Sequence, residues 1–390
     1  MRSHVPWMLV FAGMWGCAPQ KPDVVHVSTV PTSEPERVAP GEPIVDAAPV
    51  DAGSSEDVRP DLPPAWTAEH VAQAMDAGKP LPEELSQVLG SVEFDPFPEQ
   101  LVLDAHYWVS NENFHHLYKP WIDDHGGILL GVGTDQNYLM AGWSRSPILL
   151  MMDFDEQIRN VHEIYGVIFR RTATPSEHVR AWSKEEQVVS WLGEDFEGVR
   201  LEELKTTYSR SRRSVLVRLR KVITDYKERE IPTYLSDQAQ YDFVRSLWTN
   251  GRVFSLRGDL TADKTMVQIA RALADHQLVL GIVYLSNAEQ YFDFTPEFRR
   301  NIIAQPFDER SVVLRTRPWD ELGFPEGGSY HYNVQAAGNF REWLETHRVK
   351  NASRLLAGWR SNDDEIPGLS EVKRKPRPTS NPPEIAPHAP

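Results

Sequence analysis

Five short apolar runs constrain the fold of this chain more than any other feature of its sequence. They lie at residues 127–133, 147–155, 252–260, 278–285 and 311–315. A strand with one exposed face alternates apolar and polar residues, so these nearly continuous runs indicate strands buried on both faces. Helical patterns separate them, such as those at 158–168 and 264–276. The sequence therefore predicts an α/β fold with a doubly wound, mostly parallel sheet covered by helices.

The same runs place the folded domain at residues 65–361. Within it, residues 183–235 are charged and helix-prone, which predicts a helical insertion between two strands. Residues 18–64 contain ten prolines and no aromatic residue, and residues 362–390 contain seven prolines. Such segments bury too little apolar surface to offset the entropy of ordering them. We therefore expect a disordered linker at 17–64 and a disordered tail at 362–390.

The first 17 residues have the pattern of an export signal. A positive charge at residue 2 is followed by an apolar run that ends at Gly16, directly before Cys17. This run is shorter than the about 20 residues of a membrane-spanning helix, and its length suits a signal peptide at 1–16. Gly16 and Cys17 resemble the end of a bacterial lipobox, in which the cysteine receives a lipid. The alternative is an ordinary secretory signal whose cysteine is incidental.

A lipid on Cys17 would tether the domain to a membrane of the cell envelope. Ala18 follows the cysteine in place of the aspartate that commonly retains lipoproteins at the inner membrane, so the outer membrane is the expected location. The net charge of −15 disfavours nucleic acid as a partner, because nucleic acid attracts positive surfaces. A basic run at 210–213, with Arg218, Arg220 and Lys221, is expected to be a solvated helix face.

Polar residues follow four of the predicted strands at the point where each strand ends. In a doubly wound sheet, ligands bind outside the carboxyl ends of the strands, where the strand order reverses. The sequence therefore predicts a ligand site in this position. Its residues are Gly131, Gly133, Asp135 and Asn137 after the first strand, Asp153 and Asp155 after the second, Asp259 after the third, and Ser286, Asn287 and Glu289 after the fourth.

The order of these residues resembles that of the class I S-adenosylmethionine-dependent methyltransferases, which have a Rossmann-like fold. The resemblance covers about residues 126–316. It implies that S-adenosylmethionine is a candidate cofactor and that Gly131 and Gly133 let the backbone approach it. It also implies that Asp153 or Asp155 binds the ribose hydroxyls and that Asp259 lies near the adenine.

A narrower resemblance rests on two segments, residues 131–138 and 284–291. Together they are similar to an uncharacterised bacterial family with this methyltransferase-like fold, which has leptospiral and other lipoprotein-like members. This resemblance implies a fold and not a reaction.

Two positions depart from the methyltransferase pattern. Leu129 occupies the place of an acidic residue, and Asp135 replaces the third glycine of the loop. The carboxylate of Asp135 would repel the carboxylate of the methionine moiety. In addition, S-adenosylmethionine is made and used in the cytoplasm, whereas the predicted lipid anchor places the domain outside it.

The acidic pair Asp153 and Asp155 has two other interpretations. It resembles the Asp-x-Asp motif of glycosyltransferases, in which carboxylates hold a divalent cation against a sugar nucleotide. One of the two carboxylates is also expected to cap the following helix, since a helix N-terminus favours negative charge. The cluster of His115, His116 and residues 123–125 matches no zinc pattern, so no metal site is predicted.

Three functions follow from these observations. The favoured one is an envelope lipoprotein that displays a methyltransferase-like domain, which binds a small nucleoside-type ligand or has no catalytic role. The second is a methyltransferase that uses S-adenosylmethionine, in which Asp135, Asn287 or Glu289 positions the acceptor. The third is a structural or interaction protein of the envelope, whose insertion at 183–235 contacts a protein partner.

Overall fold

The computed structural model describes residues 66–101, 104–362 and 366–376, all of which belong to the unit Leu62–Pro390. The predicted signal peptide at 1–16, the predicted lipid site at Cys17 and the linker up to residue 64 lie outside the described residues. Predictions about these segments therefore remain predictions.

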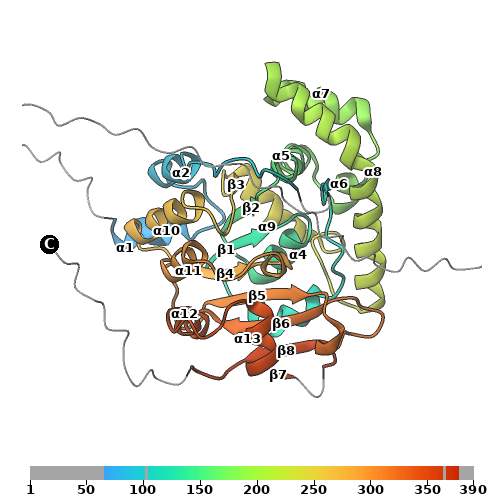
Figure 1. The fold of residues 1–390 in the computed structure, drawn as a ribbon. Helices are drawn as coiled ribbons and strands as arrows, with labels where there is room; N and C mark the ends of the chain where they lie inside the picture. The colour runs from blue at the N-terminus through green and yellow to red at the C-terminus, as the bar shows by residue number, and fades with distance from the viewer. Residues whose placement is uncertain (1–65, 102–103, 363–365, 377–390) are drawn as a thin grey trace, which may run out of the picture. The chain divides into compact units, whose positions relative to one another are not determined.

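The described residues form one eight-stranded sheet in the order β3-β2-β1-β4-β5-β6-β8-β7 (Figure 1). Neighbouring strands from β3 to β5 run parallel. Strand β6 runs antiparallel to β5, β8 runs parallel to β6, and β7 runs antiparallel to β8. The predicted α/β fold with a mostly parallel sheet is confirmed. The strands are β1 (Ile128–Val132), β2 (Ile148–Asp153), β3 (Val253–Arg257), β4 (Leu280–Tyr284), β5 (Val312–Arg317), β6 (His331–Ala336), β7 (Ser361–Asn362) and β8 (Leu369–Val372).

Helices cover both faces of the sheet (Figure 1). Helices α3 to α9 share one apolar layer with the sheet, and α1, α2 and α10 to α13 share the other. Their bounds are α1 (Ala68–Ala74), α2 (Glu83–Gly90), α3 (Lys119–Ile122), α4 (Gln136–Ser144), α5 (Glu156–Arg171), α6 (Pro175–Ala181), α7 (Glu185–Asp195), α8 (Gly198–Glu228), α9 (Gln238–Thr249), α10 (Thr265–Asp275), α11 (Pro296–Ile303), α12 (Ala337–Glu345) and α13 (Ala352–Trp359), with the short 3₁₀ helices η2 (His115–Tyr118), η3 (Ala288–Gln290) and η4 (Asp320–Leu322).

The central strands are buried on both faces because their side chains alternate between the two apolar layers. In β2, Leu149 and Met151 join the layer of α4 and α5, whereas Ile148, Leu150 and Met152 join the layer of α10. Such a strand has no solvent-facing side, which accounts for its continuous apolar run.

The segment predicted as a helical insertion contains α7 and the 31-residue helix α8. Leu204, Tyr208, Val215, Leu219 and Val222 lie on the buried side of α8, at spacings that form one stripe of the helix. This stripe packs in the same apolar layer as α5. The insertion is therefore part of the domain core and not a separate body.

The sheet extends into the segment that was predicted to be a disordered tail, and this prediction was wrong for its first part. Strand β8 pairs with β6, and its residues Leu369 and Val372 are buried. Helix α12 packs nearby, and the indole of Trp343 donates a hydrogen bond to the carbonyl of Arg374 at 2.8 Å. The prediction of disorder followed from the proline content of the whole segment, which gave no sign of the four-residue strand within it.

The strand order reverses between β1 and β4. From β1 the chain proceeds through α4 to β2 on one side, and from β3 it returns through α10 to β4 on the other side. The helices that leave β1 and β4 diverge at this point, which opens a crevice at the carboxyl ends of the two strands.

Candidate functional site

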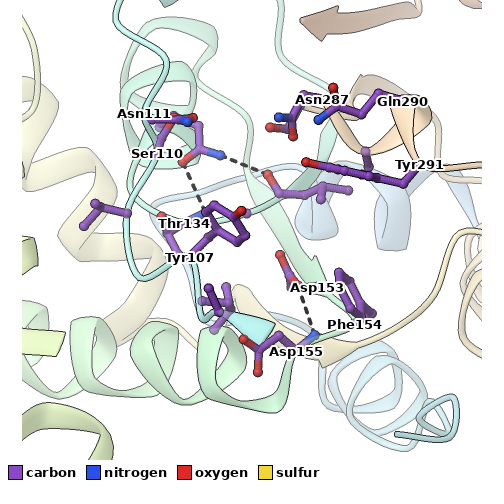
Figure 2. A pocket seen from close by; sticks show the side chains of 18 of the residues that line it. Tyr107, Ser110, Asn111, Thr134, Asp153, Phe154, Asp155, Asn287, Gln290 and Tyr291 are labelled. Atoms are coloured by element: carbon purple, nitrogen blue, oxygen red, sulfur yellow. Dashed lines mark hydrogen bonds between the residues drawn. The ribbon is translucent and has the colours of Figure 1, made fainter. Parts of the chain in front are cut away.

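A cavity of about 410 Å³ lies at the carboxyl ends of β1, β2 and β4 (Figure 2). Its volume falls in the range of roughly 300–1,000 Å³ that is usual for small-molecule sites. The chain before η2 closes one side of it. The lining residues are Leu101, Ala105, Tyr107, Val109, Ser110, Asn111, Val132, Gly133, Thr134, Gln136, Asp153, Phe154, Asp155, Ile158, Ser286, Asn287, Ala288, Gln290, Tyr291, Pro318 and Tyr330.

The structure divides the ten residues predicted to bind a ligand into two groups. One group lines the cavity and comprises Gly133, Asp153, Asp155, Ser286 and Asn287. The other group is absent from the lining and comprises Gly131, Asp135, Asn137, Asp259 and Glu289.

The loop after β1 is filled by the side chain of Gln136. Its Oε1 accepts a hydrogen bond from the Thr134 amide at 3.1 Å, and its Nε2 donates to the Val132 carbonyl at 3.1 Å. Gly133 has a φ of +89°, and a Cβ on it would overlap Nε2 of Gln136. Glycine is therefore needed here both for the left-handed backbone and for the space that Gln136 occupies.

Gly131 and Asn137 serve the packing of β1 against α4. A Cβ on Gly131 would overlap the side-chain oxygen of Asn137, which is fully buried. The predicted role of these two residues in ligand binding is therefore replaced by a close approach of strand and helix.

Asp135 is engaged by the insertion helix and not by the cavity. Arg218 of α8 donates from Nε to Asp135 Oδ2 at 2.8 Å, from Nη1 to the Asn113 side chain at 2.7 Å and from Nη2 to the Glu112 carbonyl at 2.8 Å. The other carboxylate oxygen of Asp135 accepts from the Ser110 amide at 2.9 Å. Arg218 is 5% exposed and Asp135 is 1% exposed. The structure therefore places Asp135 outside the cavity lining, and the prediction that Arg218 is solvated was wrong.

Asp153 presents its carboxylate at the end of β2, inside the cavity (Figure 2). Its Oδ1 accepts a hydrogen bond from the Asp155 amide at 3.0 Å. No basic side chain of the described residues forms an ion pair with it. Burial raises the pKa of the Asp153 carboxyl to about 7; the backbone amides of Asp155 and Gly133 lower it, and the charge of Asp155 adds to the rise.

Asp155 caps the helix that follows, as was predicted for one member of this acidic pair. Its Oδ1 accepts from the Gln157 amide at 2.9 Å, at the N-terminus of α5. Its Oδ2 lies 2.7 Å from Nδ1 of His106, which belongs to the segment before η2. Asp155 is therefore occupied by protein partners, although it also borders the cavity.

Ser286 joins the cavity to a buried carboxylate below it. Its φ is +51°, and its hydroxyl donates to Oε1 of Glu112 at 2.8 Å. Glu112 also accepts from the hydroxyls of Tyr284 and Thr316 and lies 3.1 Å from Nε2 of His115. This Glu112 network supports the floor of the cavity.

The two remaining predicted carboxylates are used elsewhere. Asp259 accepts from the amide and the hydroxyl of Thr261, both at 2.7 Å, and so closes a local turn after β3. Glu289 forms a buried ion pair with Arg315 at 2.6 Å. The structure gives neither carboxylate a place in the cavity wall.

Sequence reasoning missed the wall that comes from residues 101–111. Tyr107 of this wall is 46% exposed and lines the cavity. Gln136 and Tyr330 were also missed. Gln136 lies between two predicted residues, Asp135 and Asn137, whereas Tyr330 follows a long connection that has no local signal.

In residues 66–101, 104–362 and 366–376, no group of three or more histidine, cysteine, aspartate or glutamate side chains is arranged to hold a metal ion. Among the same residues, no helix combines the length and the apolar character required to cross a bilayer.

The comparisons with known proteins add one finding. A comparison with curated proteins found no match to this chain. A family model described as a domain of unknown function (DUF7790) matches residues 107–373, which include all eight strands and most of the cavity wall. The chain therefore belongs to the family described as a domain of unknown function, DUF7790.

Proposed function

We propose that the domain binds a small hydroxylated molecule of nucleoside type in this cavity, and that a lipid on Cys17 displays it on the cell envelope, at the outer membrane. The observation that carries the proposal is the carboxylate of Asp153. It stands at the end of β2 in the cavity, next to the loop after β1, and has no ion-pair partner among the described residues. A carboxylate in this place suits two neighbouring hydroxyls, because it accepts two hydrogen bonds at once.

The order β3-β2-β1-β4-β5 supports the finer proposal of a Rossmann-like, methyltransferase-like fold. Binding without methyl transfer is the better-supported role. The place where a methyltransferase would hold the methionine carboxylate is taken by Gln136 and by the Asp135 carboxylate. Methyl transfer remains a second candidate because an acidic residue follows β2, and titration with S-adenosylmethionine tests it.

Replacing Asp153 by asparagine should weaken nucleoside binding by about tenfold or more, because hydrogen bonds to a charged acceptor contribute about 1.5–3 kcal/mol. Calorimetric titration of the full chain carrying Cys17→Ser with adenosine measures this. The same titration with 2′,3′-dideoxyadenosine, which lacks both hydroxyls, should show weak binding to both proteins. Equal affinity of adenosine and dideoxyadenosine would contradict the role of Asp153, and an absence of adenosine binding at millimolar concentration would contradict the proposed ligand.

The affinity for adenosine should rise with pH and level off above about pH 8. The pKa of Asp153 is raised to about 7, and the ligand hydroxyls favour the ionised form, so protonation competes with binding. Binding should be about tenfold weaker at pH 6 than at pH 8. The other titratable groups that face this carboxyl are Asp155 and its partner His106. The Asp153→Asn variant is the control and should show no such slope.

The anchor is tested by metabolic labelling with a palmitate analogue. Wild-type protein should be labelled and recovered with membranes, whereas Cys17→Ser should carry no label, because the thiol is the site of lipid attachment. An unlabelled wild-type protein in the cytosol would contradict the anchor and would make cytoplasmic cofactors accessible to the domain.

A further inference from the structure

The cavity has an unbalanced set of charges. Among the described residues that line it, the only charged side chains are Asp153 and Asp155, and no lysine, arginine or histidine belongs to the lining. Asp155 is already paired with His106 at 2.7 Å. Asp153 is therefore the one carboxylate of the lining that has no side-chain partner among the described residues.

The basic side chains closest to the wall are directed into other contacts. Arg218 is held by Asp135, and Arg159 is held by Glu156 at 2.6 Å. Arg317, which precedes the lining residue Pro318, donates to the hydroxyl of Ser353 at 2.5 Å, and its Nε and Nη1 have no hydrogen-bond partner among the described residues. None of these three side chains belongs to the lining, so the carboxylate of Asp153 is the group that a bound cation would meet in the cavity.

The usual site for an anion in such a fold is closed. Phosphate groups bind at the N-terminus of the helix after β1, where free amides meet the positive end of the helix dipole. Here the Thr134 amide is bonded to Gln136, and the carboxylate of Asp135 stands at the cap position of α4. A phosphate in this place would meet a loop that the side chain of Gln136 already fills.

Two aromatic rings stand exposed at the cavity. Tyr107 is 46% exposed and Tyr291 is 52% exposed, and both belong to the lining. Figure 2 shows the two rings and the carboxylate of Asp153 around the same cavity. The third exposed aromatic residue of the described chain is Phe97. The guanidinium of Arg257 lies over its ring, 3.7 Å from the ring centroid. Among the described residues, no lysine or arginine side chain lies over the ring of Tyr107 or Tyr291.

We infer that the ligand of this cavity is an organic cation without a phosphate group, whose charged centre lies near Asp153 between the rings of Tyr107 and Tyr291. Aromatic faces beside a carboxylate are the chemistry that recognises onium groups. The inference rests on the proposed binding function at Asp153 and adds the charge of the ligand to it.

Three small probes separate charge from shape. Choline carries a trimethylammonium group, 3,3-dimethylbutan-1-ol is its neutral isostere, and phosphocholine adds a phosphate to the same cation. Each is titrated into the full chain carrying Cys17→Ser, with binding followed by calorimetry. Choline should bind about five- to thirtyfold more tightly than the neutral alcohol, and phosphocholine should bind more weakly than choline.

Variants locate the probe in the cavity. Tyr291→Leu and Tyr107→Leu should each weaken choline binding severalfold and leave the weak binding of the neutral alcohol unchanged. Phe97→Leu is the matched control, since this exposed aromatic ring lies outside the lining, and it should leave choline binding unchanged. Asp153→Asn should remove the preference for choline over the alcohol.

Equal affinity of choline and the neutral alcohol, tighter binding of phosphocholine, or no choline binding at 20 mM, about the weakest affinity of interest, would each overturn the inference. These outcomes are separable from a failure of the proposed function. If adenosine binding depends on Asp153 but choline binds no more tightly than the neutral alcohol, the proposed function is supported and only the inference of a cationic ligand is contradicted.

Discussion

Replacing Arg218 by methionine should lower the free energy of unfolding by about 3–5 kcal/mol, which is the usual cost of removing one partner from a buried ion pair. The methionine keeps much of the volume of the side chain but leaves the carboxylate of Asp135 buried without its charge partner. It also leaves the Glu112 carbonyl and the Asn113 side chain without the donors that Arg218 supplies. The measurement is urea unfolding at pH 7, followed by tryptophan fluorescence.

The matched control for Arg218 is Arg220→Met, two residues along the same helix. Arg220 is exposed, and its substitution should change the free energy of unfolding by less than about 0.5 kcal/mol. The double variant Arg218→Met with Asp135→Asn should recover part of the loss, because no uncompensated charge then stays buried. A single variant at 218 that is no less stable than the one at 220 would contradict the structural role of this ion pair.

The Arg218 contacts also bear on the cavity. The residues that Arg218 holds, from Glu112 to Asn113, directly follow the wall residues Ser110 and Asn111. A loosened wall should reduce the affinity for adenosine or choline even at temperatures where the variant is folded. The insertion helix α8 is therefore expected to support ligand binding, in addition to any contact with a partner that its outer face makes.

Replacing Glu112 by glutamine should produce the second large loss of stability, about 3 kcal/mol at pH 7. Burial alone would raise the pKa of Glu112, but His115, with the hydroxyls of Thr316 and Tyr284, outweighs this effect and lowers the pKa from its ordinary value of 4.5 to about 2. A carboxyl whose pKa is lowered by folding stabilises the folded state fully above the unfolded pKa. This stabilisation is lost as the pH falls through the folded pKa.

The pH dependence separates this charge effect from simple packing. The difference in free energy of unfolding between wild type and Glu112→Gln should be largest at pH 7 and roughly halved at pH 3. At pH 3 the Glu112 carboxyl is almost fully protonated in the unfolded state but still mostly ionised in the folded state. Glu309→Gln, at an exposed glutamate, serves as control and should behave like wild type. A difference that stays constant from pH 7 to pH 3 would show that the charge of Glu112 is not what stabilises the fold.

The Glu112 network also holds one side of the cavity. Glu112 holds Ser286, which lines the cavity with a φ of +51°. Such a backbone angle is uncommon for residues other than glycine, and surrounding contacts must maintain it. In Glu112→Gln, one of the hydroxyl groups that donate to Glu112 would face an amide nitrogen, which is itself a donor. The hydrogen bond that holds Ser286 would then weaken, and its backbone should leave the left-handed conformation more easily.

The five apolar runs predicted the parallel part of the sheet correctly. Each run became one of the strands β1 to β5, and the carboxylates and amides after them were placed at one edge of the sheet. Hydrophobic patterns succeed here because burial on both faces of a strand is a local property of its own residues. For the same reason Gly133, Asp153, Asp155, Ser286 and Asn287, which directly follow the strands, could be named as cavity residues from position alone.

Hydrophobic patterns could not predict which polar side chains pair with one another. Arg218 bonds to Asp135 across 83 positions of the chain, and Thr316 bonds to Glu112 across 204. Nothing in the neighbouring sequence distinguishes the buried Arg218 from the exposed basic residues around it. Strand β8 was hidden in the same way, since four residues within a proline-rich segment form a strand only where β6 offers an unpaired edge.

The sequence by itself determined the layers of this protein, the order of its strands along the chain and the end of the sheet at which polar groups gather, because each depends on the hydrophobicity of neighbouring residues. Only the tertiary structure decided which of those polar groups are free. Asp135, Asp259 and Glu289 are bound by protein partners, whereas Asp153 faces the cavity without a counter-charge. The physical reason is that the availability of a charge depends on the partners that folding brings within hydrogen-bonding distance, and those partners lie far away along the chain.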